Sequence, residues 1–182
     1  MTARQQTETP MDTSAIGVQP RAGAVPWMTD GVLGGLLGSA AVAILFLVRD
    51  IAAGWPLWTP STLGAALFRG EIAGELASPE VLLVVGYSVF HGAMFVGIGL
   101  IAAYLMDRNR ALKEHWFGTL VWAVIGLFIM FQILFLGFAV VFAQGLVTEL
   151  GMGWVTLANL VAAVCMAGFL THRARRYLRS SG

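Results

Sequence analysis

Residues 116–148 read WFGTLVWAVIGLFIMFQILFLGFAVVFAQGLVT, a run without a single Asp, Glu, Lys or Arg. An α-helix rises about 1.5 Å per residue and the hydrocarbon layer of a bilayer is about 30 Å thick, so about 20 apolar residues suffice to cross it. Three further uncharged runs lie at 31–48, 81–106 and 150–171. We therefore expect an all-α integral membrane protein, built as a bundle of four transmembrane helices.

The composition of the whole chain supports this fold class. Hydrophobic residues make up 58% of the 182 residues, charged residues make up 12%, and the mean hydropathy is +0.78. Soluble domains carry about 25% charged residues, so these values exclude the ordinary soluble class. The formal net charge of +1 argues against a nucleic-acid partner, and the lone Cys165 is expected to pack within its apolar run. The lipid bilayer is the expected partner.

The runs divide the chain into a polar N-terminal tail at 1–28, a transmembrane domain at 29–174 and a basic C-terminal tail at 175–182. Crossings are expected near 30–49, 80–106, 117–144 and 152–172, with a long outer loop at 50–79. As a helix the third run would be about 50 Å long, so a tilt must absorb its excess over the hydrocarbon layer. Polar and helix-weakening residues predict a turn before the fourth crossing, at Gln144, Gly145, Glu149, Gly151 and Gly153.

The basic residues predict an orientation. Four crossings place both termini and the loop after the second crossing on one side, which collects nearly all Lys and Arg residues, against Arg49 and Arg69 on the other. Because cytoplasmic loops carry the excess of basic residues, both termini are predicted to be cytoplasmic, and the expected location is a bacterial inner membrane. The last basic cluster is expected to contact anionic lipid or a partner subunit, through Arg173, Arg175, Arg176 and Arg179.

The outer loop contains GWPLWTPSTLGAALF at 54–68, which predicts a short amphipathic helix. Thr59 followed by Pro60 has the form of an N-cap and a first helical position. We expect this interfacial helix to lie flat on the outer surface as a lid over the bundle; the alternatives are docking of a partner and a re-entrant segment that lines a pore. The expected lid residues are Trp55, Pro56, Trp58, Thr59, Pro60, Leu63, Leu67 and Phe68.

Glycines recur at close-packing intervals in the first run. Gly31 and Gly35 form one G-x-x-x-G pair, and Gly34 and Gly38 form a second that overlaps it. Such pairs let the backbone of another helix approach closely. The sequence leaves open whether that helix belongs to this chain or to another subunit.

Polar residues recur at one depth of the membrane. Counting from the ends of each run places Ser39, His91, Gln132 and Asn159 near the centres of the four crossings. Polar groups in hydrocarbon normally face the interior of a bundle, so we expect these side chains to converge. Helical spacing of three and four residues adds Tyr87 and Ser88 beside His91, and Thr156 beside Asn159.

This midplane polar layer has two interpretations. In the first, interhelical hydrogen bonds fix the register of the helices, each contributing roughly 0.6 to 2 kcal/mol. In the second, His91 is a functional group, because an imidazole at mid-depth can ligate haem iron or chlorophyll magnesium, or relay protons. A chlorin needs His91 alone. A six-coordinate haem needs a second axial ligand, from another chain or from Met94, Met130 or Met166.

Known catalytic motifs are missing from the sequence. It has no G-x-S-x-G, no H-E-x-x-H and no phosphate-binding loop, so we predict no catalytic residue, no metal site and no enzyme activity. The leading hypothesis is a small accessory or structural subunit of a larger membrane complex, of the respiratory or photosynthetic kind. The alternatives are an electron-transfer or pigment protein that binds haem or a chlorin at His91, and a small transporter or membrane sensor.

Overall fold

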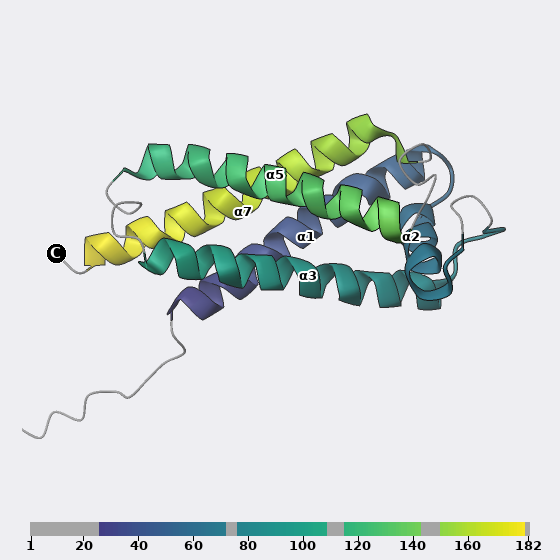
Figure 1. Cartoon of the computed structure of the whole chain (residues 1–182), viewed down its shortest axis with the longest axis horizontal. Coiled ribbons are helices and arrows are strands. Elements are labelled where there is room, and N and C mark those ends of the chain that lie inside the picture. The colour runs from purple at the N-terminus through teal and green to yellow at the C-terminus, as the bar shows by residue number, and fades with distance from the viewer. Residues whose placement is uncertain (1–25, 72–75, 109–114, 143–149, 181–182) are drawn as a thin grey trace, which may run out of the picture.

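The computed structural model describes residues 26–71, 76–108, 115–142 and 150–180. Within these residues the chain forms helices and no strand. Figure 1 shows the long helices side by side in an elongated bundle, with one short helix across one end. The helices are α1 (Pro26–Ala52), α2 (Trp58–Arg69), α3 (Val81–Arg108), α5 (Trp116–Phe142) and α7 (Met152–Ser180).

Four of these helices, α1, α3, α5 and α7, are long and apolar enough to cross a membrane. The predicted class, an all-α membrane bundle of four helices with a short helix in the first loop, is confirmed. Pro26 begins α1, where its fixed φ and missing N–H suit the first helical position. α7 continues to Ser180, through the segment expected as a tail, because no Gly or Pro interrupts it there. The predicted turn residues Gln144, Gly145 and Glu149 lie outside the described residues.

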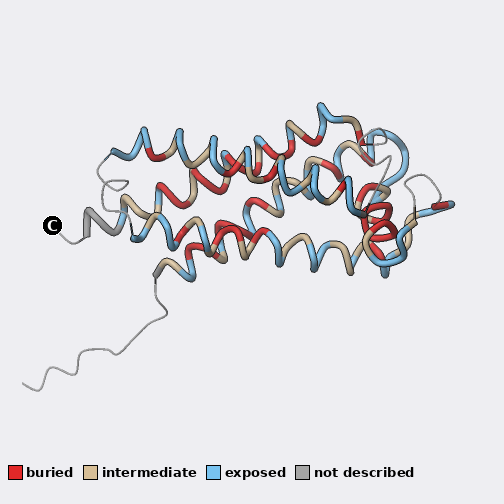
Figure 2. Tube along the Cα trace, viewed as in Figure 1, coloured by how far each residue is buried: buried red, intermediate tan, exposed pale blue. Residues whose placement is uncertain are grey.

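α1 and α7 form the centre of the bundle, and α3 and α5 flank them. α1 packs against α3 on one side and α7 on the other, and α7 packs in turn against α5. The inner face of α7 carries small residues, and Ala162, Ala163 and Ala167 have no exposed surface. α3 and α5 are bridged by the stacked rings of Phe95 and Phe131, whose centroids are 4.8 Å apart. Figure 2 shows the buried positions along the facing sides of the helices.

The backbones of α1 and α3 cross in close contact near the end of the bundle where α1 starts and α7 finishes, which we call the terminal end. A Cβ on Gly35 would lie 2.5 Å from the carbonyl oxygen of Phe95, and one on Gly31 would lie 2.7 Å from Cα of Leu100. A Cβ on Gly99 of α3 would overlap the carbonyl oxygen of Gly31. Only glycine allows so close an approach at these three positions.

The second glycine pair of α1 lies against side chains of α7 and, at Gly38, also against a side chain of α3. A Cβ on Gly34 would lie 3.2 Å from the side chain of Leu170, and one on Gly38 would lie 3.1 Å from the ring of Phe95 and 3.6 Å from Met166. The first motif therefore contacts α3, whereas the second contacts α7 at Gly34 and both α3 and α7 at Gly38. Both neighbours belong to the same chain.

From the glycine crossing, α1 and α3 diverge toward the opposite end of the bundle, where α2 lies across their gap (Figure 1). We call this the α2 end. α2 follows α1, precedes α3 and packs mainly on α3. A Cβ on Gly64 would lie only 2.6 Å from the carbonyl oxygen of Leu83, so small residues let α2 enter between the long helices.

α2 is inserted into the bundle and does not lie flat on its surface as expected. Thr59 and all residues from 61 to 66 are buried, so every face of the helix contacts protein. The buried residues are mostly serine, threonine, glycine and alanine, which are small enough to pack on every face of the helix. The sequence prediction relied on the spacing of large apolar residues, which does not reveal the burial of small ones. Among the other expected lid residues, Leu63 is buried, Trp58, Pro60 and Leu67 are half-buried, and Trp55, Pro56 and Phe68 are exposed.

The carboxylate of Asp50, near the end of α1, holds the start of α2. Asp50 is 1% exposed and accepts hydrogen bonds from the backbone N–H of Thr59 at 2.7 Å and from its hydroxyl at 2.6 Å. Arg49 lies 3.5 Å from the same carboxylate. The prediction that Thr59 is the N-cap is wrong, because α2 begins at Trp58 and its N-cap position is Leu57, with φ of 65° and no side-chain capping bond. Asp50 supplies the missing acceptor and a favourable negative charge.

Two further contacts join α2 to the start of α3. The buried hydroxyl of Ser61 accepts a 2.8 Å hydrogen bond from the backbone N–H of Glu80. Arg69 donates two hydrogen bonds to the Glu80 carboxylate, at 2.9 and 2.5 Å, and lowers the pKa of that carboxyl below its usual value. The second contact is exposed and therefore weak. α2 is thus tied to α1 at Thr59 and to α3 at Ser61.

At the terminal end, two of the four arginines expected to contact lipid or a partner are bound within the bundle. Arg173 Nε donates a 2.7 Å hydrogen bond to Asp30, which joins α7 to α1. The guanidinium of Arg175 lies over the ring of Trp116, 4.3 Å from its centroid, and joins α7 to α5. The other two are Arg176, which is exposed, and Arg179, whose side chain is outside the described part.

Replacing Gly35 by alanine is expected to destabilise the bundle by about 1–3 kcal/mol, because the new Cβ would overlap the backbone of α3. The matched control is Gly126→Ala on α5, where no atom lies within 4 Å of an added Cβ. That change is expected to be neutral or slightly stabilising through helix propensity. Thermal unfolding in detergent compares the two, and equal midpoints would contradict the glycine crossing.

Asp50→Ala is expected to loosen α2, because it removes the acceptor of two hydrogen bonds from the buried Thr59. The expected loss of local stability is about 1–3 kcal/mol, and it should appear as faster hydrogen exchange at residues 59–66. Glu71→Ala serves as the control, since its ion pair with Arg69 at 3.5 Å is partly exposed to solvent and therefore weak. If exchange in α2 were the same in both variants, Asp50 would not hold the helix.

Candidate functional site

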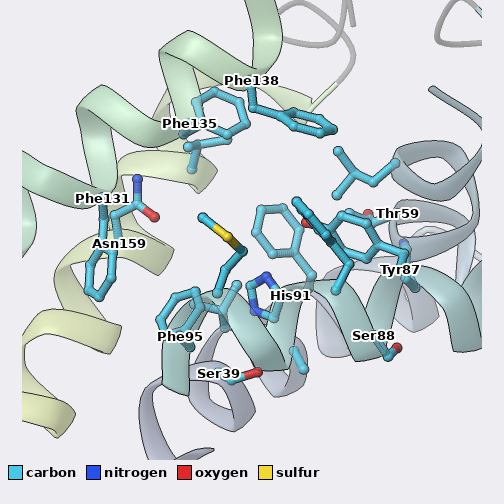
Figure 3. A pocket seen from close by; sticks show the side chains of 18 of the residues that line it. Ser39, Thr59, Tyr87, Ser88, His91, Phe95, Phe131, Phe135, Phe138 and Asn159 are labelled. Atoms are coloured by element: carbon cyan, nitrogen blue, oxygen red, sulfur yellow. The ribbon is translucent and has the colours of Figure 1, made fainter. Parts of the chain in front are cut away.

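A cavity of about 380 Å³ lies beneath α2, and all of the helices α1, α2, α3, α5 and α7 contribute to its wall. It occupies the gap that the divergence of α1 and α3 leaves at the α2 end. Its volume lies within the range of small-molecule sites in proteins. The wall is mostly apolar, and much of it is aromatic, with Phe46, Phe90, Phe95, Phe131, Phe135 and Phe138. Figure 3 shows the last four of these rings around the cavity.

The polar part of the lining is small and includes no charged side chain among the described residues. Thr59 is occupied by its hydrogen bonds to Asp50. Ser88 is exposed, and its hydroxyl donates a 2.7 Å hydrogen bond to the carbonyl of Val84, one turn earlier on its own helix. The polar residues that line the cavity are Ser39, Thr59, Tyr87, Ser88, His91 and Asn159.

His91 is a lining residue with a buried polar atom that has no hydrogen-bond partner. Its imidazole, on α3, lies beside the backbone of Ser39 on α1. The unpartnered atom is Nε2. The rings of Tyr87 and Phe95 flank the imidazole, with centroids 5.6 and 4.6 Å away. In a neutral imidazole one ring nitrogen donates a hydrogen bond and the other accepts one or binds a metal, so an unpartnered ring nitrogen can take part in recognition.

A second set of polar side chains joins α5 to α7. Asn159 Nδ2 donates a 2.5 Å hydrogen bond to Gln132 Oε1, and Gln132 Nε2 donates a 3.2 Å bond to Thr156 Oγ1. This chain matches the structural interpretation of interhelical hydrogen bonds that fix register. The Asn159 amide nitrogen points toward Gln132, and the amide oxygen points toward the cavity (Figure 3).

The predicted polar layer is therefore divided into two groups. On α1 and α3, the imidazole of His91 lies beside the backbone of Ser39 and stacks with the ring of Tyr87. On α5 and α7 the group consists of Gln132, Thr156 and Asn159. His91 and Asn159 line the cavity from the two sides, whereas Gln132 and Thr156 do not line it. Ser88 belongs to neither group.

The sequence interpretation missed the aromatic wall. Phe131, Phe135 and Phe138 are spaced four and three residues apart, which places them on one face of α5, and all three line the cavity. The spacing is visible in the sequence, but a phenylalanine stripe in an apolar helix also suits ordinary core packing. The role of Asp50 was also missed, because it depends on where the chain places Thr59 nine residues later.

The wall offers His91 no second axial ligand for a six-coordinate haem. Met94 lines the cavity, but it lies one turn from His91 on the same helix. Met130 and Met166 are outside the lining. The described lining also has no Lys or Arg to pair with the carboxylates of haem. The lining residues therefore fit a neutral molecule better than they fit haem.

Comparisons of this chain with protein-family models, with curated proteins and with solved structures find no match. The cavity is distinguished by three features: its volume, its neutral aromatic wall and the unpartnered nitrogen of His91.

Proposed function

We propose that this protein binds a small, neutral, ring-bearing molecule inside the membrane, in the cavity beneath α2. The observation that most supports the proposal is the buried Nε2 of His91, which has no hydrogen-bond partner. His91 is one of the residues that line the cavity. A buried acceptor without a partner costs about 1–3 kcal/mol, and native proteins contain few of them. A ligand that completes this hydrogen bond removes the cost, so the nitrogen favours occupancy.

The wall favours an uncharged ring system. A charged ligand would leave its charge unpaired in a medium of low dielectric constant, which is costly. Aromatic side chains provide ring faces and edges, and the stacked pair of Phe95 and Phe131 continues the line of rings from His91. Phe135 and Phe138 lie on the other side of the cavity (Figure 3).

The ligand is expected to enter from the bilayer. α2 covers the end of the bundle, but several lining residues are also exposed on the outer surface of the helices, where lipid would surround them. Ile44 is 62% exposed, Met94 is 42% exposed and Phe90 is 38% exposed, and all three line the cavity. A molecule dissolved in the membrane can reach such a site without passing through water.

This proposal follows the ligand-binding alternative of the sequence interpretation, with His91 as the recognition group. The hypothesis of an accessory subunit in a larger membrane complex stays a prediction, and a bound cofactor is compatible with it. No enzyme activity is proposed, because the cavity supports binding and presents no pair of groups arranged for acid–base or nucleophilic chemistry among the described residues.

Binding can be measured with 1-methoxynaphthalene, a neutral two-ring probe, by equilibrium dialysis against nanodiscs with and without the protein. Saturable binding above that of empty nanodiscs is expected. Ala43→Phe, at the cavity wall, should weaken it about tenfold by filling space. Ala40→Phe is the matched control, because Ala40 is exposed on the same helix and does not line the cavity. No saturable binding, or equal binding by both variants, would refute the proposal.

The orientation is proposed from the same basic residues. Arg108, Arg173, Arg175 and Arg176 lie at the terminal end, whereas Arg49 and Arg69 lie at the α2 end. We propose that the terminal end is cytoplasmic in a bacterial inner membrane and that the α2 end faces outward. The cavity then lies in the outer half of the bilayer.

Labelling of single cysteines with a membrane-impermeant maleimide tests the orientation. In a Cys165→Ala background, Ala53→Cys at the α2 end should react in intact cells, and Arg176→Cys at the terminal end should react only after permeabilisation. Both positions are exposed, so burial does not explain a difference between them. The reverse pattern would place the termini outside.

A further inference from the structure

We propose that the ligand of the cavity carries a carbonyl oxygen and accepts a hydrogen bond from the hydroxyl of Tyr87. This inference rests on the proposed function and narrows it to a chemical class, neutral ring-bearing carbonyl compounds dissolved in the membrane. It concerns binding only and involves no covalent or redox step.

Tyr87 differs from the other aromatic residues of the wall by its hydroxyl. The described lining contains six phenylalanines and one tyrosine. The ring of Tyr87 packs against the apolar cluster that includes Phe46 and Leu63, and it stacks with the imidazole of His91 at a centroid distance of 5.6 Å. A phenylalanine could make the same contacts, so packing does not account for the hydroxyl.

The hydroxyl of Tyr87 has no hydrogen-bond partner among the described residues. Its oxygen is not enclosed by protein atoms, and the side chain extends from α3 into the cavity (Figure 3). Tyrosine hydroxyls in apolar surroundings usually find a partner, because a polar group removed from water is costly without one. A ligand atom in the cavity can reach this oxygen and supply the partner.

The other hydroxyls of the described lining depend less on a ligand. Thr59 donates to a buried carboxylate, and Ser88 donates to a backbone carbonyl one turn earlier on its own helix. Ser39 makes no such bond, but a serine hydroxyl in a helix can reach the carbonyl one turn earlier by rotation of its side chain. The hydroxyl of Tyr87 lies at the far end of a rigid ring and cannot reach the backbone beside it.

The chemistry of a phenol favours donation to the ligand. A phenol hydroxyl can donate and accept, but its lone pair is partly delocalised into the ring, which makes it the better donor. A carbonyl oxygen accepts without bringing a charge, which suits a lining that has no charged side chain among the described residues. A site that donates to a carbonyl discriminates against the analogue without it, because the hydroxyl is then left unpaired.

The test compares 1-acetylnaphthalene with 1-isopropenylnaphthalene, in which a CH₂ group replaces the carbonyl oxygen. Both are dialysed against nanodiscs that carry the wild type, Tyr87→Phe or Tyr104→Phe, and binding to empty nanodiscs is subtracted. For each probe, affinities are compared between proteins, so that differences in membrane partition cancel. Tyr104 is exposed on the same helix and outside the cavity, which makes it the matched control.

The wild type and Tyr104→Phe should bind 1-acetylnaphthalene about tenfold more tightly than Tyr87→Phe does, as expected for one hydrogen bond. Binding of 1-isopropenylnaphthalene should be similar in all three proteins. If Tyr87→Phe binds the ketone as tightly as the wild type does, the inference is wrong while the proposed function stands. If neither probe binds the wild type, the proposed function fails first.

An infrared measurement on the wild type keeps the test independent of how Tyr87→Phe folds. With a ¹³C-labelled carbonyl, the stretching band of bound 1-acetylnaphthalene should lie at lower wavenumber than that of the same probe in liquid alkane, because the oxygen accepts a hydrogen bond. In Tyr87→Phe the band should return toward its position in alkane. An unshifted band in the wild type, or an equal shift in both proteins, would overturn the proposed donor.

Discussion

The close crossing of α1 and α3 determines the shape of the rest of the bundle. Gly31, Gly35 and Gly99 bring the two backbones into contact near the terminal end, and no larger residue fits there. Two straight helices that touch near one end and cross at an angle must separate at the other. The separation makes room for α2, and what α2 does not fill remains as the cavity. Packing at one end thus creates the cavity at the other.

The charged groups near the ends of the bundle hold this arrangement and leave the cavity neutral. Asp50 ties α2 to α1, and the pair of Asp30 and Arg173 ties α1 to α7 at the terminal end. Both carboxylates are buried and hydrogen-bonded, the condition under which charges are tolerated away from water. With these groups paired elsewhere, His91 is the described lining residue that retains a buried unpartnered atom.

Sequence patterns predicted the four crossings well, because uncharged runs of membrane length are rare in soluble proteins. They predicted α2 as a helix but not its insertion, since Ser61, Thr62 and Gly64 resemble surface residues until α3 is placed beside them. Depth counting placed His91 and Asn159 at one level, yet it could not show that a cavity separates them. That gap depends on the angle between α1 and α3, which no local pattern encodes. The unpartnered Nε2 of His91 likewise depends on how the neighbouring helices pack around the imidazole.

An experimental density map of the protein, extracted in a mild detergent with its native lipids, tests the central claim most directly. The account predicts non-protein density beneath α2, in contact with Nε2 of His91 and bordered by Phe131 and Phe135. It also predicts that α1 and α3 touch at Gly35 and separate toward α2. A cavity filled by protein side chains, with Nε2 of His91 bonded to one of them, would contradict the account.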